Sequence, residues 1–177
     1  MDIFEAIKER RSIRKYESRD VEEEKVRKVI DSAITAPSWA NTQCWRFVIV
    51  RDDEIKEKLS ETLSDSNPAT DAMTQAPVLI VGCVEEGLSG FSGGEPFDGK
   101  DWSMFDMGLA VQNLMLAAKG LDLGTVPIGA FDKDKVGEIL DVPKDLDVVV
   151  MTPLGYPAED SNSSRKDLEQ FMVRDKF

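Results

Sequence analysis

Residues 102–120 read WSMFDMGLAVQNLMLAAKG and carry apolar side chains on nearly every side of the helix that they predict. A helix that is apolar all round packs against neighbours on several sides at once. Gly120 follows the last strongly patterned residue and is expected to end the helix. We therefore expect residues 102–119 to form a central helix enclosed by the rest of the chain.

Weaker patterns predict the elements around this helix. Apolar runs predict buried strands at 46–50, 77–84 and 147–157 and a short strand and turn at 124–131. Helical spacing predicts one helix that carries Ile3, Phe4 and Ile7, a second that Ala36 and Pro37 end, others at 53–63 and 133–140 with Asp132 as N-cap, and a short one near Leu168. This order does not alternate as a doubly wound parallel sheet requires. The prediction is an α+β sandwich with the sheet covered on both faces.

Composition bounds the class of protein. A chain of 177 residues with 41% hydrophobic residues is expected to form one domain, residues 1–177, with a real core. Its 22 basic and 34 acidic residues give a net charge of −12, which disfavours nucleic acid and anionic membrane surfaces as partners. No apolar run reaches the length of about 18 residues that spans a bilayer, and residues 1–11 do not resemble a secretion signal.

The residues available for chemistry are few. Histidine is absent, so Ser-His and Cys-His relays and the commonest transition-metal ligand are missing, and no metal site is expected. Cys44 and Cys83 lack the spacing of a zinc or redox motif, which fits a reduced, cytoplasmic protein. Residues 85–101 hold five glycines and predict a mobile connection or lid.

Two polar stretches stand out against this background. RRSIRKY (10–16) places several cations around one hydroxyl, and guanidinium forks with a serine suit a phosphate monoester. The alternative is that these cations interact with the negative end of the helix dipole and with nearby acidic side chains. APSWANTQCW (36–45) combines two carboxamides with two tryptophans, which suits a planar heterocycle. The alternative there is a polar turn with Trp45 in the core.

In this order, the motifs resemble those of the nitroreductase family of flavin enzymes. The resemblance covers nearly the whole chain and comprises RRSIRKY, APSWANTQCW, APVLIVGC, DMGLAVQNLMLAAKGLDLGTVPIGAF, LGYP and SSRKDLEQF. It implies a three-layer sandwich with a mostly antiparallel central sheet, assembled as a homodimer. It also implies flavin mononucleotide (FMN) as cofactor, with one flavin in each of two sites at the subunit interface.

The resemblance assigns roles residue by residue. Arg10, Ser12 and Arg14 match the residues that hold the phosphate and ribityl chain, with Arg11 beside them and Arg165 as a second phosphate arginine. The family often has lysine where this chain has Ser163. The remaining matches are a segment that crosses to the other subunit's flavin (Pro37, Ser38, Trp39, Asn41, Gln43), a candidate at the flavin's polar edge (Asn67), and a turn whose backbone faces the flavin edge (Ile128, Gly129, Ala130).

The implied activity is hydride transfer from NADH or NADPH to the flavin and, in a second half-reaction, to a small oxidised acceptor such as a nitroaromatic or quinone. Flavin chemistry needs no protein nucleophile, so no catalytic side chain is expected, and the amide of Gly129 would lie near the reactive ring nitrogen. Cys44, where relatives often have proline, is either a packing substitution or a catalytic thiol. The alternatives are reductive dehalogenation or other flavin chemistry in the same fold, a non-catalytic flavin-binding module, and a phosphate-ester binder without flavin.

Overall fold

The computed structural model describes residues 1–176, and its centre is a four-stranded antiparallel sheet. The sheet order is β1–β2–β6–β5, and every pair of neighbouring strands is antiparallel. The strands are β1 (Trp45–Val50), β2 (Val78–Glu85), β6 (Leu146–Gly155) and the two-residue β5 (Gly124–Thr125). The expected α+β class and the antiparallel sheet are therefore confirmed.

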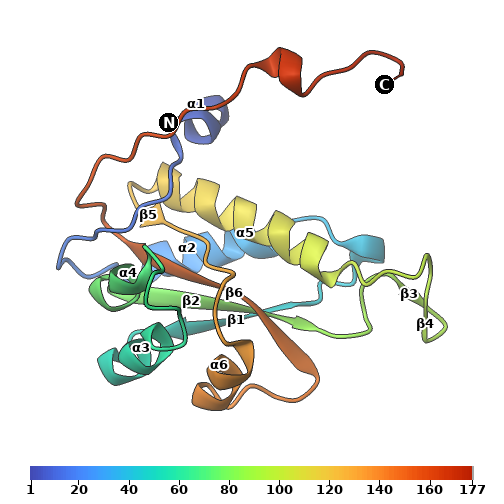
Figure 1. Ribbon diagram of the computed structural model, residues 1–177, viewed down its shortest axis with the longest axis horizontal. Helices are drawn as coiled ribbons and strands as arrows, with labels where there is room; N and C mark the ends of the chain where they lie inside the picture. The colour runs from blue at the N-terminus through green and yellow to red at the C-terminus, as the bar shows by residue number, and fades with distance from the viewer. Residues whose placement is uncertain (177) are drawn as a thin grey trace.

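Helices cover both faces of the sheet and make three layers (Figure 1). On one face lie α2 (Glu23–Ile34) and the long α5 (Ser103–Gly120), and on the other lie α3 (Asp53–Ser60), α4 (Thr70–Gln75) and α6 (Lys133–Ile139). α5 buries residues on several sides, as its apolar sequence predicts. It ends at Gly120, one residue beyond the expected range.

Strand β2 shows why the sheet needs cover on both faces. Val78, Ile80 and Val84 pack in the cluster under α2 and α5, whereas Leu79 and Val81 pack in the cluster with α3, α4 and α6. All five are 2% exposed or less, because successive side chains of a strand point to opposite faces. A continuous apolar run is thus the expected sequence for this position.

Some local predictions differ from the structure. Residues 70–75 form α4, a short helix that the sequence patterns do not predict, because the turn-forming Asn67 and Pro68 directly precede it. Residues 85–101, expected to be a mobile connection, contain a small hairpin of β3 (Phe91–Ser92) and β4 (Glu95–Pro96). The helix expected at 53–63 ends at Ser60. Asp132 caps α6 as expected, since its Oδ1 accepts a hydrogen bond from the Lys135 amide at 3.2 Å.

The two ends of the chain leave apolar side chains in solvent. α1 (Ile3–Glu9) presents Ile3, Phe4 and Ile7, each more than half exposed. The C-terminal segment, with the 3-10 turn η2 (Leu168–Gln170), runs out beyond α5 (Figure 1) and exposes Leu168, Phe171, Met172 and Val173. Within residues 1–176, no helix has the length and apolar character to cross a membrane.

Candidate functional site

The basic residues after α1 lie on an extended segment that is anchored to β5. Ser12 pairs with Thr125 in a parallel bridge, and the Ile13 amide donates to the Thr125 carbonyl at 3.0 Å. Side chains of an extended chain alternate between two sides. Ile13 is 9% exposed and packs against Gly124, so its neighbours Ser12 and Arg14 face the opposite way. The spacing places Arg10, Ser12 and Arg14 on one common side.

The arginines of this region form a cationic cluster. The pKa of Arg10 is lowered by burial first and then by the positive charges of Arg165 and Arg11. Within residues 1–176, none of Arg10, Arg11, Arg14 and Arg165 forms an ion pair, although the chain is strongly acidic. The Nε atoms of Arg11 and Arg14 are buried there without a hydrogen-bond partner. Such a cluster fits an anion with several acceptor oxygens.

Arg11 also serves the end of α1. Its guanidinium donates to the carbonyls of Lys8 at 2.6 Å and Arg10 at 2.9 Å. The sequence allowed two roles for these cations, binding a phosphate or stabilising the C-terminal end of the helix. Arg11 takes the second role. Arg10 and Arg14 make no such side-chain bond among the described residues.

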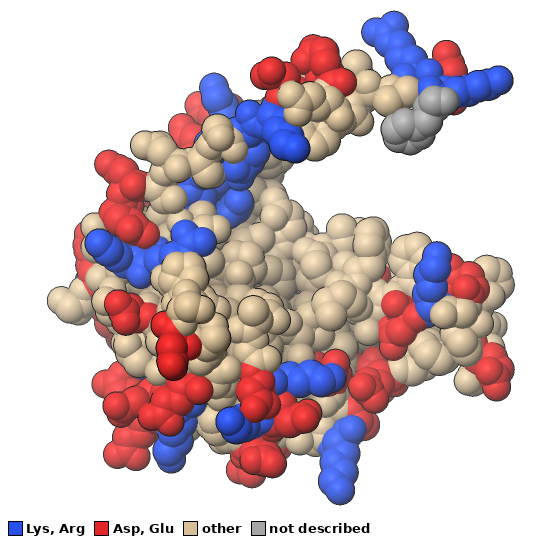
Figure 2. Space-filling model, in the orientation of Figure 1, with Lys and Arg blue, Asp and Glu red and all other residues tan. Residues whose placement is uncertain are grey.

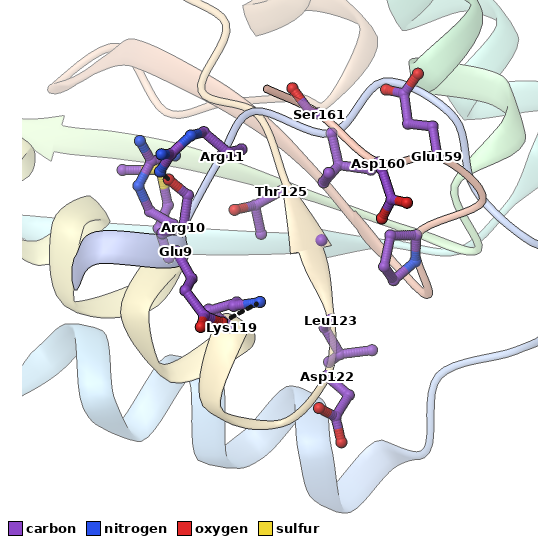
Figure 3. A pocket seen from close by; sticks show the side chains of 14 residues that line it. Glu9, Arg10, Arg11, Lys119, Asp122, Leu123, Thr125, Glu159, Asp160 and Ser161 are labelled. Carbon is purple, nitrogen blue, oxygen red and sulfur yellow. Dashed lines mark hydrogen bonds and ion pairs between the residues drawn. The ribbon is translucent and has the colours of Figure 1, made fainter. Parts of the chain in front are cut away.

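A cavity of about 220 Å³ opens beside Arg10 and Arg11 (Figure 3). Its walls come from the end of α1, the last turns of α5, β5 and residues 157–161. An ion pair of 3.3 Å between Glu9 and Lys119 crosses one wall. Further acidic side chains line it, namely Asp122, Glu159 and Asp160. The two arginines therefore belong to a hollow, not to a flat surface.

A second cavity of about 170 Å³ lies along the same segment toward residue 14. It brings together five residues that are far apart in the sequence and were predicted to share a site: Arg14, Asn67, Ile128, Gly129 and Ala130. Asn67 holds the start of α4, because its Oδ1 accepts from the Ala69 amide at 3.0 Å, and its Nδ2 lies 3.5 Å from the Ala130 carbonyl. Asn67 thus lies at the cavity, as its predicted place at the flavin's polar edge requires.

The turn at 128–130 is attached to the sheet through Ile128, whereas the backbone amides of Gly129 and Ala130 are free to bind a ligand. Ile128 exchanges two backbone hydrogen bonds with Met151, at 2.8 and 3.0 Å. The amides of Gly129 and Ala130 donate no hydrogen bond to any part of residues 1–176, and both residues are exposed. Apart from its two chain neighbours, no described residue has an atom within 4 Å of the place where a Cβ of Gly129 would be. The turn therefore presents an unobstructed backbone edge to a ligand.

The loop of residues 37–43 lies elsewhere. It contacts the first turn of α5 through Trp39, whereas Arg10 and Arg11 share a cavity with Met115 and Lys119 near the last turns. Pro37, Ser38, Trp39, Asn41 and Gln43 line neither of the two cavities. One chain by itself does not bring this loop to the arginines. Trp45 is 5% exposed and belongs to the core, as the alternative for that residue held.

Cys44 is a buried thiol and has none of the features of a nucleophile. It is 0% exposed, and burial, reinforced by the Asp106 carboxylate, raises its pKa to about 11. A reactive thiol needs a lowered pKa and access. The structure therefore favours the packing substitution over the catalytic thiol.

Sequence reasoning missed two polar residues near that thiol. Asp106 and Ser89 are 1% and 0% exposed and bond to one another. A lone acid in an otherwise apolar stretch of α5 is the signal that would have identified Asp106, because a charge is rarely buried without partners. Ser89 lies in the glycine-rich stretch and has no comparable signal.

A phosphorylated planar cofactor fits these features. Arginines that form no ion pair within residues 1–176, and guanidinium nitrogens buried there without a hydrogen-bond partner, suit the phosphate. The open turn at 128–130 suits the edge of a flat ring. Arg10 and Arg11 border the first cavity and Arg14 borders the second, so the basic residues of this one extended segment reach both hollows.

Comparison with known proteins identifies the family. Residues 7–79 and 65–156 match the model of the Nitroreductase family. An inferred NADH dehydrogenase/NAD(P)H nitroreductase of Methanothermobacter thermautotrophicus is 37% identical over 172 residues, which cover 95% of this chain and 83% of that protein. The FMN reductase (NAD(P)H) of Bacillus subtilis is 32% identical over 173 residues, covering 90% of this chain and 68% of that protein.

A solved structure agrees with this result. The FMN-dependent nitroreductase of Clostridium difficile R20291 superimposes with a TM-score of 0.83 at 25% identity, over 98% of this chain and 99% of that one. Fold, sequence and the order of motifs therefore agree, and the chain belongs to the nitroreductase family of flavin oxidoreductases.

Proposed function

We propose that this protein, as one domain spanning residues 1–177, binds FMN and transfers hydride from NADH or NADPH to a small oxidised acceptor such as a nitroaromatic or quinone. The observation that carries the proposal is the cluster of arginines that form no ion pair within residues 1–176, one of which, Arg14, borders a cavity with open backbone amides. Two relatives with FMN in their names, the Bacillus reductase and the Clostridium nitroreductase, support the choice of cofactor.

In this proposal the residues of the chain bind the cofactor and orient its ring. Arg10, Ser12 and Arg165 hold the phosphate, and Arg14 with Asn67 borders the polar end of the ring. The amides of Gly129 and Ala130 act as hydrogen-bond donors at the ring edge, where a main-chain donor favours the more electron-rich, reduced state. When bound, the flavin supplies the hydride transfer, so the chain needs neither a nucleophile nor a histidine.

The proposal includes a homodimer with shared sites. Apolar side chains exposed on α1 and on residues 168–173 need cover, and a second copy of the chain supplies it. Figure 2 shows a broad hollow between the C-terminal segment and the β3–β4 hairpin, floored by uncharged side chains, which has room for a partner. In such a dimer, the loop 37–43 serves the partner's flavin, which accounts for its distance from the arginines of its own chain.

The test is an absorbance spectrum of the protein after addition of excess FMN and removal of the unbound cofactor, repeated without oxygen in the presence of NADH or NADPH. A retained flavin band that bleaches with either nucleotide, and returns when a quinone is added, supports the proposal. A band that does not bleach would indicate a binding module without reductase activity. Absence of a retained band would refute FMN binding. Iodotyrosine as acceptor in place of the quinone tests dehalogenation.

A further inference from the structure

The loop 37–43 adopts a strained conformation. Ala40, Asn41 and Gln43 have φ values of 46°, 59° and 51°, in the left-handed region that favours glycine. Three such residues in four positions persist only when the surrounding structure holds them. Within the loop, Ser38 Oγ accepts a hydrogen bond from the Gln43 amide at 2.9 Å, which closes the turn on itself. That bond does not attach the loop to the rest of the protein.

Asp106 makes the attachment. The Trp39 amide donates to both carboxylate oxygens of Asp106, at 3.2 Å to Oδ1 and 3.1 Å to Oδ2. The carboxylate is 1% exposed and forms no ion pair with any lysine or arginine within residues 1–176. It lies in the first turn of the 18-residue helix α5, where the helix dipole favours a negative charge. The buried carboxylate of Asp106 is therefore stabilised by hydrogen bonds from neighbouring donors and, among the described residues, not by an ion pair.

The same carboxylate holds the base of the β3–β4 hairpin. The Ser89 hydroxyl donates to Asp106 Oδ2, and the Cys44 sulfur lies 3.9 Å from the same oxygen. The Ser89 carbonyl accepts from the Trp102 amide at 3.1 Å, which fixes this residue to the start of α5. One buried group thus joins the loop, the hairpin base and the central helix.

We propose that Asp106 is a positioning residue: it holds the loop 37–43 in its strained conformation and couples that conformation to the hairpin base at Ser89. The functional consequence rests on the proposed function, because the loop is taken to complete the flavin site of the partner subunit. The positioning itself concerns contacts within one chain and is measurable without flavin.

Hydrogen–deuterium exchange of the flavin-free protein, followed on peptides that cover 36–44 and 45–50, tests the positioning. In Asp106→Ala we expect exchange in 36–44 to accelerate by about tenfold, since its charge-assisted hydrogen bond is lost, with β1 unchanged. Asp106→Asn keeps an acceptor for Trp39 and is expected to stay within about threefold of the native protein. Asp101→Asn is the matched control, because Asp101 accepts from the Ser103 amide at the same helix start and does not contact the loop.

A second variant, Ser89→Ala, tests the coupling between the loop and the hairpin base. It also keeps the proposal testable if Asp106→Ala fails to fold. Ser89→Ala leaves Asp106 and every direct contact of the loop in place. The proposal predicts faster exchange in 36–44 in this variant as well. Unchanged exchange of this peptide in Ser89→Ala would overturn the coupling. Unchanged exchange in Asp106→Ala, or an equal acceleration in Asp101→Asn, would overturn the positioning role.

FMN titration of the same variants separates this inference from the proposed function. We expect Asp106→Ala to bind FMN about tenfold more weakly and Asp106→Asn to restore the affinity. Native protein that does not bind FMN would refute the proposed function and leave the exchange prediction to be judged alone. Accelerated exchange in Asp106→Ala with unchanged FMN affinity would confirm positioning and refute its role at the flavin site.

Discussion

Ile13 and Gly124 pack so closely that a Cβ built on Gly124 would lie 2.8 Å from the Cβ of Ile13. Real Cβ atoms essentially never approach one another this closely, so any side chain at 124 has to displace Ile13. Ile13 lies between Ser12 and Arg14, and its burial turns both of them toward the proposed cofactor. A glycine on β5 therefore sets the position of the segment that we propose binds the phosphate.

This packing predicts the effect of Gly124→Ala. We expect the free energy of unfolding to fall by about 1–3 kcal/mol from overpacking, and FMN affinity to fall with it because Ser12 and Arg14 shift. Thermal unfolding with and without FMN measures both effects. The matched control is Gly137→Ala in α6, where nothing lies within 4 Å and alanine should stabilise by about 0.5–1 kcal/mol. A Gly124→Ala protein with native stability and affinity would contradict this role of Ile13.

The exposed apolar ends predict a dimer that charge can break. Phe4 and Phe171 are 79% and 69% exposed, and Phe4→Glu or Phe171→Glu would place a carboxylate in the proposed interface. We expect light scattering coupled to gel filtration to show the native protein as a dimer and these variants as largely monomeric. Ile49→Glu, on the edge strand β1, is the control and should leave the mass unchanged. A native protein of monomer mass would refute the dimer.

Shared sites predict complementation between two defective chains. One chain carries Ser38→Ala, which impairs the loop, and the other carries Arg10→Ala with Arg14→Ala, which impairs the arginine cluster. If the loop serves the partner's flavin, the heterodimer has one fully intact site, so about half of its sites should retain FMN while each mutant homodimer retains little. Flavin absorbance per tagged heterodimer measures this. No recovery in the heterodimer would mean that loop and arginines act within one chain.

The two buried thiols predict a loss of stability at high pH. Burial raises the pKa of Cys44 and of Cys83 to about 11, from an ordinary value of 9.0. Between pH 9 and about 11 the unfolded chain releases these protons and the folded chain keeps them. The free energy of unfolding therefore falls with rising pH by roughly 1.4 kcal/mol per pH unit for each thiol at most. Urea unfolding between pH 8 and 10 measures the slope.

Cys83→Ala provides the control, because it should make that slope shallower and leave the slope below pH 8 unchanged. At pH 8 the native protein should not react with a disulfide reagent until it is unfolded. Rapid labelling of native Cys44 at this pH would contradict the packing role of the residue.

Most of the architecture could be predicted from the sequence, because its hydrophobic patterns restrict where each element can be buried. The apolar run in β2 and the all-round apolar α5 each admit few positions in a fold, and both lie where expected. The helix α4 and the β3–β4 hairpin were missed because both are short; Asn67 and Pro68 precede α4, and glycines lie in and around the hairpin. Their conformation depends on tertiary contacts, such as Met73 in the core and the bond of Ser89 to Asp106.

Part of the candidate site, the basic segment 10–14, could also be predicted from a local pattern. Alternation along 10–14 is a local property, so the shared side of Arg10, Ser12 and Arg14 follows from an extended chain. That Asn67 and residues 128–130 share a cavity with Arg14 depends on contacts across the fold, and here only the family resemblance placed them together. The strain at Ala40, Asn41 and Gln43 has no sequence signal, since none of the three is glycine.

The most direct test of the central claim, that the arginine cluster binds a phosphate, is a titration of the flavin-free protein with FMN and with riboflavin, which lacks the phosphate. We expect FMN to bind at least about a hundredfold more tightly, since several charge-assisted hydrogen bonds depend on the phosphate. We also expect this preference to collapse in Arg10→Ala with Arg165→Ala, and to persist in Arg27→Ala on the exposed face of α2. Equal affinity of the native protein for the two flavins would refute phosphate binding by the arginine cluster.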